Sequence, residues 1–222
     1  RKSGIRTLRS NYLTLHTDLP PEPAVDELPR VFDQAVPQWA EFFGVHSEQL
    51  REWRVVASVM KNQERFRQYG LLPDDLPPFL NGIQNVDQLW INEQPSDYYR
   101  RHLLLHEGTH AVMNRIFGHV GPVWYREGIA ELVSTHRLAD GQLKLAQMPS
   151  NKQEVAYWGR IRIVKDDIRN GTLRSIRSIV GSTTRDYLEV ESYAWSWALQ
   201  AFGRHHPDYG PVFARLQQDM YE

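Results

Sequence analysis

The first long pattern in the chain is a helical repeat of apolar residues between Ala24 and Phe43. Apolar positions three or four residues apart fall on one face of an α-helix. Gly44 follows as the expected helix end, although Pro29 and Pro37 argue against an unbroken helix. The apolar face consists of Val25, Leu28, Phe32, Val36, Trp39 and Phe43.

The remainder of the first half favours strands. Residues 11–17 alternate and are rich in β-forming residues, and residues 53–60 predict a second strand. A short polar helix over 62–69 is closed by Gly70. Two shorter strands are expected over 79–83 and 86–92.

The period of the pattern changes in the second half. A helix is predicted over 97–117, with Ser96 or Asp97 as its N-cap and Gly118 directly after its end. Pro122 opens a second helix, which runs toward residue 135.

A hairpin and three further helices complete the expected elements. Asp140 and Gly141 form a dipeptide typical of a tight hairpin turn. It joins strand patterns over 133–138 and 142–146, and helices follow over 151–170, 183–203 and 208–220. We therefore expect an α+β fold in a single domain over 1–222, with a strand-rich layer in 1–95 and helices in 96–222.

Composition and charge exclude several classes of protein. The chain has 222 residues, of which 41% are hydrophobic, and its net charge is −1. Mixed charge gives no case for nucleic acid as a partner, and no apolar run is long enough for a membrane span. Without cysteine, a metal could be bound only by His and carboxylates.

Two features suggest export from the cell. The absence of Cys fits a secreted or periplasmic bacterial protein. The chain starts with Arg1 rather than Met, so we expect that an upstream segment has been removed.

The strongest chemical motif is His106-Glu107-Gly108-Thr109-His110, which is H-E-x-x-H within a predicted helix. Residues i and i+4 share a helix face, so the two imidazoles can converge on one zinc ion. Glu107 lies beside the pair, where it can act as a general base toward water. Apolar neighbours predict that the segment is buried, which makes a chance pattern on a solvated face the weaker interpretation.

A catalytic zinc needs a third protein ligand. The metzincin pattern is excluded, because Ile116 stands where that pattern has a third His. The next helix supplies Glu127 and Glu131, again four residues apart on one face. One of the two can bind zinc, and the other can accept a ring N–H from a ligand His.

These two segments resemble the gluzincin metallopeptidases, including the aminopeptidase-N group, in which W-x-x-E-G-x-A follows H-E-x-x-H. The matching run here is Trp124 to Glu131, after a slightly shorter gap than in that group. The resemblance implies that His106, His110 and Glu127 bind zinc. It also implies that Glu131 does not bind the zinc itself but supports one of the residues that do.

The wider chain is similar to a family of uncharacterised bacterial peptidases, through NYLTLHTDLP, FFGV and WRVVASVMKNQERF as well as the H-E-x-x-H helix. The resemblance implies a zincin-like fold, with a mostly antiparallel N-terminal sheet packed on the H-E-x-x-H helix. It also implies that an edge strand within 86–92 binds the substrate backbone.

Gluzincins further need a group that stabilises the oxyanion. Tyr193 lies about as far beyond the third ligand as the family's Tyr or His, and Ser196 follows it. The alternative is that Tyr193 is simply a core aromatic residue. Tyr157 and Tyr187 are weaker candidates, and we expect the other histidines, including His102, not to be ligands.

The sequence thus predicts a zinc metallopeptidase that carries one zinc ion and cleaves a peptide or protein substrate. Metal-activated water would attack the scissile carbonyl, with Glu107 as general base and Tyr193 as a further catalytic group. Two alternatives stay open: a non-catalytic metal-binding or interaction domain of the same fold, and a hydrolase of cell-wall amides. An intact Glu107 argues against the first, because metal binding alone needs no base.

Overall fold

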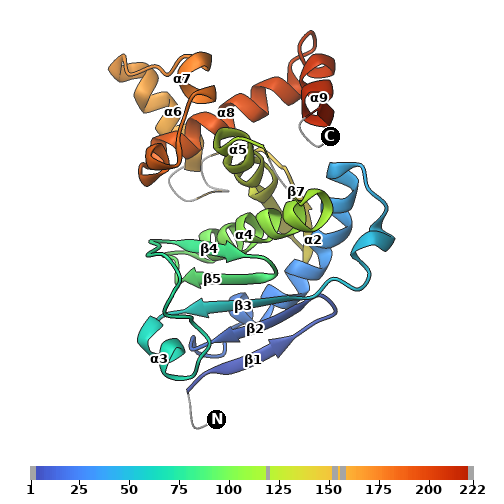
Figure 1. The fold of residues 1–222 in the computed structure, drawn as a ribbon, viewed down its shortest axis with the longest axis vertical. Helices are drawn as coiled ribbons and strands as arrows, with labels where there is room; N and C mark the ends of the chain where they lie inside the picture. Colours follow the sequence, from blue (N-terminus) through green and yellow to red (C-terminus); the bar gives the residue numbers. More distant parts are fainter. Residues whose placement is uncertain (1–3, 119–120, 152–154, 156–158, 220–222) are drawn as a thin grey trace. The chain divides into compact units, whose positions relative to one another are not determined.

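The structure, a computed structural model, describes residues 4–118, 121–151, 155 and 159–219. The chain forms two compact units (Figure 1). Unit 1 comprises Arg1–Val112 and Arg137–Leu145, and unit 2 comprises Met113–His136 and Ala146–Glu222. The expectation of a single domain stays a prediction.

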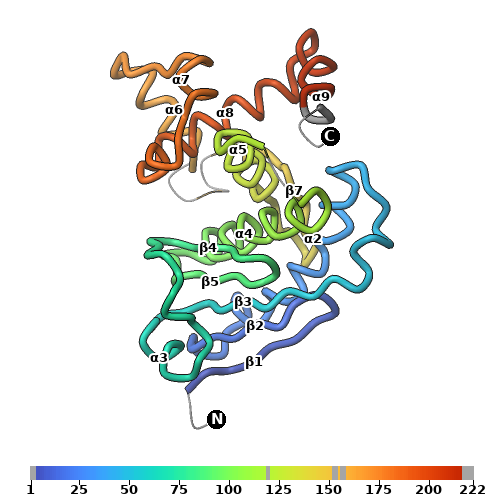
Figure 2. Tube along the Cα trace, viewed as in Figure 1, coloured from blue at the N-terminus to red at the C-terminus, as the bar shows by residue number. Residues whose placement is uncertain are grey.

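Unit 1 is built on a five-stranded sheet. Its strands lie side by side in the order β1-β2-β3-β5-β4 (Figures 1 and 2). Edge strand β1 comes first in the chain, followed by the inner strands β2 and β3. The strands are β1 (Arg6–Arg9), β2 (Leu13–Thr17), β3 (Val55–Met60), β4 (Gly82–Asn85) and β5 (Gln88–Asn92).

The sheet is mixed, so the prediction of a mostly antiparallel sheet is wrong. Strand β2 is parallel to β3, and β3 is parallel to β5, whereas β1 and β4 are antiparallel to their neighbours. The connections between the parallel strands run through helices, as parallel pairing requires. The α+β class itself is confirmed.

The edge strand next to β5 is β4, not a strand within 86–92. The sequence predicted its position as 79–83, about three residues early. Strand β4 pairs with β5 through a tight hairpin in which Val86 has a positive φ of 53°. Apolar runs this short do not fix strand ends, because turn residues rather than the pattern decide where pairing begins.

The backbone of β4 has one side turned away from the sheet. Asn92 donates its N–H to Asn81 O, so this pair is hydrogen-bonded across the ladder. In an antiparallel ladder the direction of the peptide groups alternates. The N–H and C=O groups of Gly82 and Gln84 therefore point away from β5.

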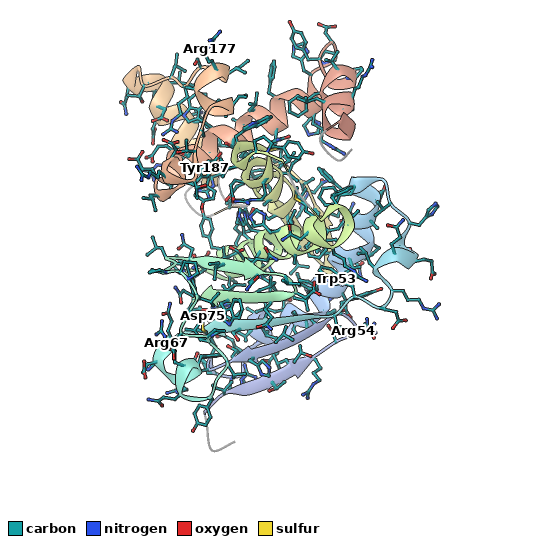
Figure 3. All side chains as sticks on the ribbon, in the orientation of Figure 1. Trp53, Arg54, Arg67, Asp75, Arg177 and Tyr187 are labelled. Atoms are coloured by element: carbon teal, nitrogen blue, oxygen red, sulfur yellow. The ribbon has the colours of Figure 1, made fainter. Side chains whose placement is uncertain are left out.

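One face of the sheet is covered by apolar packing. Helix α2 (Leu28–Phe43) follows the short α1 (Pro23–Asp26) and contacts β2. It runs through Pro37 without a break and ends at Gly44, which is left-handed as predicted. Trp53, labelled in Figure 3, packs edge-on against Trp39.

A further hydrophobic cluster of unit 1 forms around helix α3 (Gln63–Gln68). This helix contributes Phe66, which is packed with Met60 and Trp90. The short 3-10 helix η1 (Ser47–Leu50) links α2 to β3.

Helix α4 (Asp97–Phe117) spans the predicted range and carries H-E-x-x-H. The Ser96 side chain accepts from the Tyr99 N–H at its start, and Gly118 follows its end with a φ of 70°. Arg100 binds both carboxylate oxygens of Glu93, which fixes the first turn of α4 to the end of β5.

A close approach between α4 and α2 depends on Gly108. A Cβ added there would lie 2.7 Å from the Trp39 ring and 2.9 Å from the Phe32 ring. Trp39 Nε1 also donates to Thr109 Oγ1 at 3.0 Å. The glycine of H-E-G-T-H therefore lets the motif helix lie directly on aromatic rings.

The predicted hairpin is formed by β6 (His136–Ala139) and β7 (Gln142–Leu145). Asp140 and Gly141 both have positive φ, which suits a two-residue hairpin turn. The strand pattern had been expected from residue 133, but the preceding helix continues to Ser134. The amides of Gln34 and Gln38 on α2 bind the backbone of β7 and its turn.

Unit 2 is helical. Helix α5 (Val123–Ser134) packs extensively against α8 (Val190–His205), and α8 also contacts α6 (Gly159–Asn170) and α9 (Gly210–Asp219). Pro122 is the N-cap of α5 rather than its first helical residue. A Cβ added at Gly128 would lie 2.7 Å from the backbone oxygen of Ser196, so this glycine permits the α5–α8 packing.

Three boundaries in unit 2 differ from the predictions. Helix α6 begins at Gly159 rather than 151, although residues 152–154 and 156–158 lie outside the described part of the chain. Helix α7 (Ile176–Val180) was missed, and the predicted helix over 183–203 is a 3-10 helix η3 (Thr184–Leu188) followed by α8. Among the described residues, no helix is long and apolar enough to cross a membrane.

The Gly108 contact can be tested by substitution. We expect Gly108→Ala to lower the free energy of unfolding by about 1–3 kcal/mol, because the methyl group overpacks against rigid rings. Helix propensity alone predicts the opposite sign, a gain of about 1 kcal/mol. Urea unfolding of parent and variant measures the difference, and a stabilised variant would show that the contact is loose.

Candidate metal centre

The two motif histidines lie one turn apart on α4. His106 and His110 are both buried, and their Nε2 atoms are 3.1 Å apart. Their rings are nearly perpendicular, at 86°, with centroids 4.8 Å apart. The helix thus presents two imidazole nitrogens toward one point, as the i, i+4 spacing predicts.

Glu107 is buried beside the edge strand of the sheet. A Cβ placed on Gly82, the first residue of β4, would lie 2.7 Å from Glu107 Oε1. The carboxylate therefore occupies the space that any other residue at position 82 would fill.

His102 lies one turn before His106 on the same helix. Its ring stacks on Tyr98, with centroids 6.0 Å apart, and lies 6.3 Å from the ring of His106. This stacking does not test the expectation that His102 is not a ligand.

Helix α5 presents Glu127 and Glu131, both buried, four residues apart on one face. Arg126 donates to Oε1 of Glu127 through its Nε and Nη2 atoms, at 3.2 and 3.1 Å. This contact involves only one of the two carboxylate oxygens.

Glu131 is held differently. Arg160 of α6 donates from Nε to Oε2 at 2.8 Å and from Nη2 to Oε1 at 2.6 Å. This bidentate pair engages both oxygens of a carboxylate whose side chain is only 3% exposed. Arg160 thereby compensates the buried charge of Glu131.

Tyr187, labelled in Figure 3, is a buried phenol close to Glu127 within unit 2. Its hydroxyl lies 2.5 Å from the Ser196 hydroxyl. Burial raises the pKa of Tyr187 to about 12, with a smaller contribution from the negative charge of Glu127, while the Ser196 hydrogen bond opposes the shift. Tyr187 is therefore a neutral hydrogen-bonding group at physiological pH.

Tyr193 is half-buried and lies edge-on against Tyr187, with ring centroids 5.0 Å apart. The guanidinium of Arg160 also lies over the Tyr193 ring, 5.5 Å from its centroid. This aromatic packing does not test the predicted catalytic role, which stays a prediction. Tyr157, the remaining candidate, lies outside the described residues.

Two sets of three buried side chains could hold a metal ion in the described part of the chain. One consists of His106, His110 and Glu127, and the other of His102, His106 and Glu131. The first is the set predicted from sequence. Its donors, two imidazole nitrogens and one carboxylate oxygen, suit a divalent transition metal. The second set needs Glu131, whose two oxygens already bind Arg160.

Sequence reasoning missed Arg160 and Gly82. Arg160 lies 29 residues from Glu131 and belongs to no motif. A glycine within a strand often marks a place where another group approaches closely. Nothing in the sequence pattern shows that the group next to Gly82 is Glu107.

No protein-family model matches the chain, and no curated protein matches its sequence. The motif and the geometry of the site therefore carry the functional argument.

The Arg160–Glu131 pair makes a testable contribution to stability. We expect Arg160→Met to lower the free energy of unfolding by about 2 kcal/mol, because Glu131 stays buried without its partner. This is below the loss for a fully buried pair, since 25% of the Arg160 side chain is exposed. Arg162→Met is the control, because Arg162 pairs with Asp166 in solvent and should change stability by at most about 0.5 kcal/mol. Equal effects in chemical denaturation would contradict the structural role of Arg160.

Alkaline pH tests the environment of Tyr187. A folded-state pKa of about 12, above the ordinary value of 10, stabilises the fold below pH 10, and this contribution is lost as pH rises toward 12. We expect the parent to lose more stability over this range than Tyr187→Phe, which has no ionisable phenol there. Urea midpoints at increasing pH measure this, with exposed Tyr69→Phe as control. Parallel curves for parent and Tyr187→Phe would rule out the shifted pKa.

Proposed function

We propose that this chain is a zinc-dependent metallopeptidase of the gluzincin type. One observation carries the proposal: two buried imidazole nitrogens lie 3.1 Å apart on one helix face, next to a buried glutamate. Two nitrogens on a tetrahedral zinc ion are about 3.3 Å apart for Zn–N bonds of about 2.05 Å. The pair fits zinc with little adjustment.

Glu127 is the proposed third ligand. Two imidazoles and one carboxylate form a His₂Glu set, which leaves a fourth position for water or substrate, as in catalytic zinc sites. Glu131 stays outside the shell, fixed by Arg160, where it can accept from a ligand histidine and orient its ring.

When bound, zinc would polarise a carbonyl group and lower the pKa of water to about 7. Glu107 supplies the base. Its carboxylate accepts a proton from the attacking water and then delivers it to the leaving amine. A neighbouring acceptor of this kind is unnecessary for metal binding alone, and this favours catalysis over a purely metal-binding domain.

The edge strand offers a way to place a peptide. The outward peptide groups of Gly82 on β4 can pair with an extended substrate backbone by strand addition. Gly82 also lies against Glu107. A substrate paired with β4 would thus bring one of its peptide bonds near the proposed base. This arrangement of β4 and α4 within unit 1 supports the zincin-like fold.

Tyr193 remains our proposed oxyanion-stabilising residue. Tyr187 is the weaker candidate, because its hydroxyl is already engaged at 2.5 Å with Ser196 in a buried position. Its better-supported role is to pack beside Tyr193.

Metal content is the first test. We expect about one zinc ion per chain in the purified protein by elemental analysis, and strongly reduced zinc in His106→Ala and Glu127→Ala, because each removes a ligand. His46→Ala is the matched control, since His46 is exposed and outside both candidate sets. Zinc bound as tightly by Glu127→Ala as by the parent would exclude Glu127 as a ligand.

Turnover is tested separately with Glu107→Gln. We expect this variant to keep its zinc and to lose hydrolysis of a peptide library by a factor of about 10² or more, as loss of general-base catalysis predicts. Cell-wall peptide fragments in the same assay distinguish a specialised amidase. Zinc binding by a parent that cleaves neither substrate class would favour the non-catalytic alternative.

A further inference from the structure

We propose that Gly82 is a positioning residue for Glu107: its missing side chain is the space in which the carboxylate of the base is held beside the edge strand. The inference rests on the proposed peptidase function. It concerns one contact, between the first residue of β4 and the second residue of the H-E-x-x-H motif.

The distances show how closely the two residues approach. A Cβ on Gly82 would lie 2.7 Å from Glu107 Oε1, 3.1 Å from its Cγ and 3.2 Å from its Cδ. A methyl group at position 82 would therefore overlap Glu107 Oε1 and press against Cγ and Cδ. No residue except glycine fits at position 82 while Glu107 keeps this conformation.

The backbone gives no other reason for a glycine here. Gly82 is absent from the glycines with positive φ, so any L-residue could adopt its conformation. Glycine also weakens a strand, because it adds conformational entropy to the unfolded chain and packs no side chain. Space for Glu107 is the reason that the structure provides.

The obstacle at Gly82 differs from the obstacle at Gly108. At Gly108 the added methyl group meets the rigid rings of Trp39 and Phe32. At Gly82 it meets the side chain of Glu107, which can change its rotamer. An alanine at position 82 therefore moves the carboxylate rather than the fold.

Moving the carboxylate should impair catalysis selectively. A displacement of about 1 Å in a catalytic group can lower the rate about 10²-fold. Glu107 is not one of the proposed zinc ligands, so zinc binding should be retained. Alanine also keeps the peptide groups of β4, so KM should change less than kcat.

The test compares Gly82→Ala with Gly210→Ala. A Cβ at Gly210 meets nothing closer than 3.4 Å, and Gly210 lies on α9. We expect Gly82→Ala to lower kcat for peptide hydrolysis about 10- to 100-fold, with zinc content, KM and melting temperature near the parent values. Gly210→Ala should match the parent. An unchanged kcat in Gly82→Ala would overturn the proposal, and so would lost zinc or a loss of stability that accounts for the lower rate.

A second readout does not depend on turnover. The side-chain carboxyl ¹³C resonance of Glu107 can be assigned in the zinc-loaded protein as the signal missing from Glu107→Gln. We expect Gly82→Ala to shift this resonance and Gly210→Ala to leave it in place. If the parent cleaves no peptide, the proposed function fails while this shift still establishes the contact. An unshifted resonance rejects the positioning role even in an active enzyme.

Discussion

The close approach of each motif helix to a supporting helix is the constraint on which the candidate centre depends. A glycine directly follows Glu107 in the H-E-x-x-H motif of α4, and another directly follows Glu127 in α5. Gly108 lets α4 lie on the rings of Trp39 and Phe32, and Gly128 lets α5 lie on the backbone of α8 at Ser196. A side chain at either glycine would push the helix away and displace the candidate metal ligands, which lie within two residues of it. The two glycines thus fix the positions of the donor side chains through packing rather than through contact with a ligand.

Buried charge is the cost of such a centre, and the chain compensates it unevenly. Both oxygens of Glu131 are bound by Arg160, whereas Arg126 reaches one oxygen of Glu127. An ion pair with two bonds orients a carboxylate and reduces its attraction for a cation, because the guanidinium already supplies the positive charge. This difference between two glutamates on one helix face favours our proposal that Glu127 binds the metal and that Glu131 supports a ligand.

The sequence predicted the parts of this structure that depend on local pattern. Helix α4 has the predicted limits, and the turn at Asp140 and Gly141 formed as expected, because capping and turn residues act over a few positions. The pattern failed where pairing between distant segments decides the outcome. It placed the edge strand in 86–92, whereas β4 forms at Gly82–Asn85, and it gave the sheet the wrong strand directions. The partner of Glu131 was missed for the same reason, since Arg160 follows no spacing rule.

The glycines also show why a motif alone does not describe such a site. H-E-x-x-H identifies the proposed base, Glu107, but not the space around its side chain. That space is set by Gly82, which precedes Glu107 by 25 positions in the sequence and belongs to another element. Gly108 and Gly82 would meet an added methyl group at the same distance of 2.7 Å, yet one faces rigid rings and the other a mobile carboxylate. Alanine at Gly108 should therefore destabilise the fold, because the aromatic rings cannot move aside. Alanine at Gly82 should instead move the carboxylate of Glu107, because a flexible side chain can change its rotamer.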